Sequence, residues 1–119
     1  MTEFRFLING NKFSLDSDVI IIGRGGVAIT REIERSLHVM LEAPLEWRAA
    51  RAAQKFCKNE KEAKKHAISI DQKRKEFREY FHGKESDYTR FDVTYNTMTL
   101  SVDEIVESII NLMQTRQFI

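Results

Sequence analysis

Charged side chains at helical spacing are the residues of this sequence best suited to chemistry. Asp71, Arg74 and Arg78 follow one another at three and four residues, so a helix would bring them to one face. They lie in a basic segment, residues 48–84, with a local charge of +7, whereas the rest of the chain sums to −6. A basic segment between acidic ends suggests a surface that faces an anion. The alternative is a solvated, charge-rich helix in which Asp71 and Arg74 form an ordinary surface ion pair.

Residues that commonly act as nucleophiles or metal ligands show no useful pattern. Cys57 has no evident histidine partner and no metal-ligand spacing, and His66 and His82 are too far apart for a zinc site. His38 lies in an apolar stretch and is expected to be a core residue. Ser14 and the other serines lack a nucleophile-elbow context. We therefore expect no catalytic residue and no metal site.

Short strand-like runs dominate the first half of the chain. Phe4–Ile8 and Lys12–Leu15 flank Asn-Gly-Asn, which readily accepts positive φ, so they predict a β-hairpin over residues 1–17. Val19–Ile22 and Leu37–Glu42 are typical of buried strands. Phe91–Tyr95 is a further short strand candidate.

Helical patterns fill most of the remainder. A short helix is expected at 27–35, and Pro44 is well placed to open another that ends near Cys57. Asn59 with Glu62, and Ser101 with Glu104, form capping boxes before two further helices. The helix after Ser101 should turn one apolar face to the core; its members are Ile105, Val106, Ile109, Leu112 and Met113. Strands that alternate with helices predict a single α/β domain over residues 1–119, with parallel strands.

Three segments together resemble the cytidylate-kinase-like family of P-loop nucleoside monophosphate kinases. They read VIIIGRGG from Val19, LHVMLEAPLEWR from Leu37 and FDVTYNTMTLSVDE from Phe91. A long basic helix pair lies between the last two segments, like the lid of that family. Order and spacing agree over residues 18–113. The resemblance implies a truncated, three-layer P-loop-kinase-like fold with a short, mainly parallel sheet, and the hairpin added at its N-terminus.

The resemblance also implies roles for six residues. Intact members of the family transfer the γ-phosphoryl group of ATP to a nucleoside monophosphate with Mg²⁺, and this chemistry relies on positioned positive charge. Arg24 matches an arginine that contacts the acceptor phosphate, and Arg48 and Arg51 match arginines on the helix after the next strand. Asp71 and Arg74 match a pair that reads the pyrimidine and its phosphate, and Arg78 could share their face. Without the resemblance, Arg24 is a turn residue and Arg48 and Arg51 are surface residues.

The sequence departs from the family at the phosphate-binding loop. No Gly-x-x-x-x-Gly-Lys-Ser/Thr is present, and the stretch from Gly10 to Ser14 does not match it. The strand that carries this loop would lie between the strands at 19–22 and 37–42, so its loss leaves backbone groups unpaired. We expect the N-terminal hairpin to fill that place, or a second copy or partner chain to complete the sheet.

Two functions follow as hypotheses. The first is a nucleotide- or phosphate-binding protein that corresponds to the acceptor and lid half of a nucleoside monophosphate kinase. Its phosphoryl transfer is lost or depends on a missing part, so enzyme activity and the use of ATP and Mg²⁺ stay open. The second is a non-enzymatic regulatory or interaction module that reuses the fold. It predicts an exposed apolar patch or strand edge instead of converging arginines.

Composition narrows the setting. The 119 residues carry a net charge of +1 and no aromatic-rich basic surface, so nucleic-acid binding is not expected. The longest apolar run is Val19–Ile22, far too short to span a membrane. One cysteine excludes an internal disulfide, and no signal peptide is evident, so a cytoplasmic location is expected.

Overall fold

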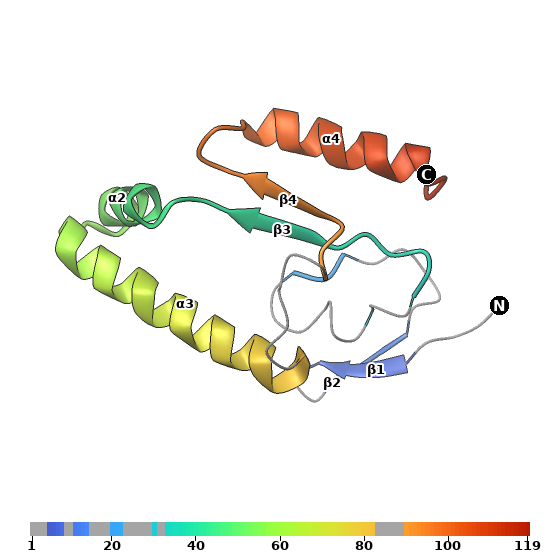
Figure 1. Ribbon diagram of the computed structural model, residues 1–119, viewed down its shortest axis with the longest axis horizontal. Helices are drawn as coiled ribbons and strands as arrows, with labels where there is room; N and C mark the ends of the chain where they lie inside the picture. Colours follow the sequence, from blue (N-terminus) through green and yellow to red (C-terminus); the bar gives the residue numbers. More distant parts are fainter. Residues whose placement is uncertain (1–4, 9–10, 15–19, 23–29, 31–32, 83–89) are drawn as a thin grey trace.

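The described residues form a small α/β arrangement of three helices and a two-stranded parallel sheet, preceded by a hairpin (Figure 1). The computed structural model describes residues 5–8, 11–14, 20–22, 30, 33–82 and 90–119. The α/β class and the parallel strand pairing predicted from the sequence are confirmed. Over the described residues, the sheet is smaller than the sheet of the three-layer fold that the family resemblance implies.

The N-terminal hairpin consists of β1 (Arg5–Ile8) and β2 (Asn11–Ser14). The two strands pair antiparallel, from Arg5 opposite Ser14 to Ile8 opposite Asn11. This confirms the hairpin that the Asn-Gly signal predicts. The hairpin forms its own two-stranded sheet and does not pair with the parallel strands, so the expectation that it fills a central place in that sheet is wrong.

The parallel sheet consists of β3 (Val39–Glu42) and β4 (Val93–Asn96). The Val93 amide donates to the His38 carbonyl at 3.3 Å, and the Thr97 amide donates to the Glu42 carbonyl at 2.8 Å. The backbone N–H and C=O groups of Met40 and Glu42 therefore point toward β4. By alternation, the N–H and C=O groups of Val39 and Leu41 face the opposite edge. The described residues supply no strand on that edge.

The strand predicted at 19–22 is wrong at the residues that the structure describes. Ile20–Ile22 form no strand, and the side chains of Ile20 and Ile22 are 90% and 93% exposed. The β-branched composition favours an extended chain, but a strand also needs a partner. Most of the helix expected at 27–35 lies outside the described residues; Thr30 is helical, and residues 34–35 form a turn.

Two helices follow β3 and pack on each other. Helix α2 (Leu45–Phe56) begins after Pro44, as predicted, and ends at Cys57, whose φ of 53° lies in the left-handed region. Helix α3 (Glu60–His82) follows, and the Asn59 side chain accepts a hydrogen bond from the Glu62 amide at 2.8 Å. Ala49, Ala53 and Ala63 are buried between the two helices. Small side chains let the helix backbones approach closely, so this contact buries little apolar area.

Helix α4 (Val102–Thr115) follows β4 and lies along its outer side, away from α2 and α3 (Figure 1). Its capping box is formed as predicted: the Ser101 hydroxyl accepts from the Glu104 amide, and the Glu104 carboxylate accepts from the Ser101 amide. Ile105 and Tyr95 are buried between helix and strand, and the Tyr95 hydroxyl lies 2.6 Å from the Ser108 hydroxyl. Val106, expected in the core, is 47% exposed.

The molecule is more extended than a compact domain of its length. The Cα radius of gyration is 16.5 Å, compared with about 13.5 Å for 119 residues packed normally. Figure 1 shows the reason: the α2–α3 pair and the β3–β4–α4 unit lie on different sides of the molecule. Most of the basic segment, residues 48–84, lies on this helix pair, so the pair presents these charges to solvent.

Candidate functional site

Five of the six predicted site residues lie on the α2–α3 pair. Four of them, Arg48, Asp71, Arg74 and Arg78, are linked by charge. Arg48 on the first turn of α2 donates two hydrogen bonds to the Asp71 carboxylate on α3, at 2.9 and 2.8 Å. Its Nε donates to the Ala43 carbonyl at 2.9 Å. Arg48 therefore ties the end of β3 to the middle of α3, in the planar, two-bond geometry that arginine forms with a carboxylate.

Arginine side chains of both helices act on the Asp71 carboxylate. The hydrogen bond from Arg48 is the main cause that holds the pKa of Asp71 below its ordinary value, with partial burial opposing it. The charges of Arg48, Arg74 and Arg78 add to the lowering. In turn, the hydrogen bond to Asp71 raises the pKa of Arg48. Both side chains of the pair remain partly exposed, so solvent screens this interaction.

Arg74 and Arg78 lie one turn apart on α3, on the face that carries Asp71. Arg74 is exposed and Arg78 is half-buried. The predicted grouping of Asp71, Arg74 and Arg78 is thus present, and the structure adds Arg48 to it from another helix. A carboxylate bound by one guanidinium group, with two more on the same face of its helix, leaves a net positive site that can attract an anion.

The remaining two predicted site residues are not part of this cluster. Arg51 is exposed, and its guanidinium stacks over the ring of Trp47 at 4.8 Å, one turn back on α2. This is a local cation–π contact. Arg24 lies outside the described residues, so its predicted phosphate contact stays a prediction.

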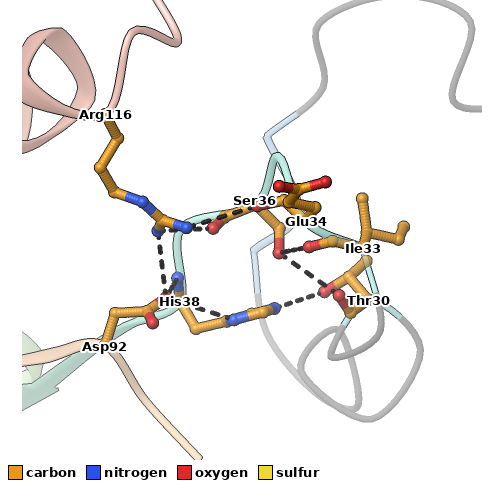
Figure 2. A network of polar contacts seen from close by, with 7 residues as sticks. All are labelled: Thr30, Ile33, Glu34, Ser36, His38, Asp92 and Arg116. Carbon is orange, nitrogen blue, oxygen red and sulfur yellow. Dashed lines mark hydrogen bonds and ion pairs between the residues drawn. The ribbon is translucent and has the colours of Figure 1, made fainter.

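A second polar network joins distant parts of the chain at the start of β3 (Figure 2). The Thr30 hydroxyl lies 2.7 Å from His38 Nε2, and Asp92 accepts a hydrogen bond from the His38 amide at 2.6 Å. Arg116, just after α4, donates to the carbonyls of Ser36 and Glu34. The expectation that His38 is a core residue holds only in part, because its side chain is 13% exposed and has polar partners in Thr30 and Asp92.

The second network could not be read from the sequence. Its long-range contacts, from His38 to Asp92 and from Arg116 to Glu34 and Ser36, join residues that are 54 to 82 positions apart. Thr30 is 9% exposed, so its hydroxyl is shielded from any substrate, and the network serves to hold the segment before β3 against β4 and the end of α4. The described residues contain no group of three or more acidic, histidine or cysteine side chains that could hold a metal ion.

A shallow groove of about 510 Å³ lies beside α4. Tyr95, Glu104 and Glu107 line it, and no lysine or arginine does. Its acidic lining does not suit an anion, so the arginines of α2 and α3 remain the better candidates. No helix in the described part of the chain is both long and apolar enough to cross a membrane.

The described residues form an α/β chain with parallel strands and an arginine-bearing helix pair after β3. The sequence pattern of the cytidylate kinase-like family matches residues 10–99. The chain belongs to this family. No curated protein matches the chain.

Proposed function

We propose that this chain binds the phosphate of a nucleoside monophosphate through the arginines around Asp71 and does not transfer phosphoryl groups by itself. The observation that carries the proposal is the position of Asp71. Arg48 donates two hydrogen bonds to it from α2, while Arg74 and Arg78 follow it on the same face of α3 and add positive charge. Three guanidinium groups near one carboxylate provide both a phosphate-binding surface and an acceptor for a base amino group. Family membership supports a nucleotide rather than another anion.

Arg48 and Arg74 have different expected roles. The fork of Arg48 is already engaged by Asp71 and the Ala43 carbonyl, so this residue fixes the site. Arg74 is exposed on the adjacent turn and can orient its guanidinium toward a phosphate. Arg24 and Arg51 are proposed as further phosphate contacts, since they match the family pattern.

The residues do not fit the phosphates of ATP or their magnesium ion. The sequence has no Gly-x-x-x-x-Gly-Lys-Ser/Thr loop, whose backbone amides and lysine would hold the donor phosphates. Within the described residues no acidic cluster provides metal ligands either. We therefore place only the acceptor nucleotide on this chain.

Calorimetric titration with CMP, UMP, cytidine and inorganic phosphate tests the proposal. CMP should bind more tightly than cytidine, and Arg74→Ala should weaken CMP by about tenfold or more, as expected for a lost charged hydrogen bond. Lys75→Ala is the matched control, because it removes one positive charge from the neighbouring, exposed position. Equal losses in both variants would reduce the effect to general electrostatics. No binding of CMP at millimolar concentration would contradict the proposal.

The second candidate is an interaction module, and a specific observation favours it. The outer edge of β3 presents the backbone groups of Val39 and Leu41, and the Leu41 side chain is 60% exposed. An open strand edge next to an exposed apolar side chain is suited to pairing with another strand. Hydrogen exchange at the Val39 and Leu41 amides distinguishes the readings, since a partner strand would slow it and CMP bound to α3 would not.

A further inference from the structure

Helix α4 carries an apolar stripe that faces solvent. Val102, Val106 and Ile110 follow one another at intervals of four residues, which places them on one side of the helix. Their side chains are 77%, 47% and 41% exposed. The flank of the helix next to this stripe carries Ile105, which is buried against β4. The stripe is therefore additional to the face that the fold of the chain uses.

The position of α4 leaves this stripe accessible. Figure 1 shows α4 on the outer side of β4, at the border of the molecule, with the basic helix pair on the far side. Single exposed apolar residues are common on protein surfaces, but a run over two turns of one helix indicates a helix-binding surface. The helix that carries this stripe also carries charged residues, and these limit what can cover it.

Charge is distributed unevenly along α4. Asp103, Glu104 and Glu107 all lie in its first half, and the helix contains no lysine or arginine. Beyond its last turn, Arg116 and Arg35 both lie over the ring of Phe118, at 4.6 and 5.6 Å, and Arg116 also lies 3.9 Å from the Asp92 carboxylate. Two guanidinium groups and one carboxylate leave this end cationic. An acidic beginning and a cationic end make the helix complementary to an antiparallel copy of itself.

We propose that two copies of this chain associate through α4, with the helices antiparallel and Val106 and Ile110 of each stripe at the centre of the contact. A two-fold axis between Val106 and Ile110 sets each of these side chains against the other residue of the partner copy. The same arrangement brings the first turn, with Asp103, toward the cationic end of the partner and opposes the two helix dipoles favourably. A parallel pair would place six carboxylates together.

The expected association is weak. A helix of 14 residues is about 21 Å long, and one such contact buries less than the roughly 800 Å² per partner of a standard interface. Dimers should therefore form at tens to hundreds of micromolar chain and dissociate on dilution. This inference does not depend on nucleotide binding.

Sedimentation velocity of the full chain over a micromolar to near-millimolar series tests the proposal. Val106→Asp should weaken the dimer by about tenfold or more, since it buries a carboxylate in the apolar contact. Asn111→Asp adds the same charge to an exposed position outside the stripe and should leave the dimer unchanged. Circular dichroism of both variants checks that α4 remains folded. A chain that stays monomeric at the highest concentration, or a dimer unaffected by Val106→Asp, overturns the proposal.

Cross-linking provides a second measurement that does not disrupt the surface. In a Cys57→Ser background, chains with Val106→Cys are mixed with chains with Ile110→Cys and oxidised. The antiparallel arrangement predicts that mixed disulfide dimers exceed both self-linked species. Self-linked dimers in excess would indicate a parallel or unrelated contact and overturn the proposed geometry.

Discussion

At the scale of single residues, Arg48 and Asp71 connect structure to the proposed site. Spacing on α3 alone predicts that Asp71 and Arg74 interact, but the structure gives Asp71 its closest partner from α2. Arginine suits this position because a single side chain reaches Ala43 at the end of β3 and Asp71 on α3. The pair therefore fixes where α3 lies relative to the sheet. It thereby also fixes the positions of Arg74 and Arg78 on that helix.

The Arg48–Asp71 pair makes stability depend on pH in acid. Because the folded-state pKa of Asp71 is lowered, its contribution is complete above the ordinary carboxyl pKa and disappears as pH falls through the lowered value. Asp71→Asn should cost about 0.2–1 kcal/mol at neutral pH, since the pair is partly exposed. The difference from the unmodified chain should narrow as the pH falls below about 4. Urea unfolding at several pH values measures it, and a difference that is constant down to pH 3 would contradict the assignment.

At the scale of elements, capping and turn signals were the most reliable guides. Pro44 opens α2, the Ser101–Glu104 box begins α4, and Asn-Gly turns the hairpin, because each acts through hydrogen bonds or dihedral angles within a few residues. The strand at 19–22 failed because strand formation depends on a partner that the local sequence does not specify. The link from Arg48 to Asp71 was missed for the same reason, since the two residues are 23 positions apart.

The capping box of α4 gives a prediction at this scale. Ser101→Ala removes the side chain that accepts a hydrogen bond from the Glu104 amide, and it should destabilise the fold by about 1 kcal/mol. Ser101→Asp is the matched control, because its carboxylate can accept the same bond and also favours the helix N-terminus. Urea titration followed by circular dichroism compares the three chains. Equal midpoints for Ser101→Ala and the unmodified chain would mean that α4 does not depend on its cap.

At the scale of the whole molecule, the described residues bury few large apolar side chains. Among the described residues, the buried apolar side chains are Ala49, Ala53, Ala63, Tyr95 and Ile105, and three of these five are alanine. Large apolar residues remain in water on β3 and α4 and in the segment before β3.

A small buried core implies that unfolding of the isolated chain exposes little new surface. The slope of the unfolding free energy against urea scales with that surface, so we expect a value at or below the bottom of the roughly 1–3 kcal/mol/M range of small proteins. Dilute chain isolates this property, because association at high concentration would add buried area and raise the midpoint. The measurement is a urea titration at micromolar chain, repeated at a tenfold higher concentration. A slope in the middle of the range at both concentrations would mean that the chain buries a normal core in solution, and that the exposed residues of β3 and α4 are covered within one copy.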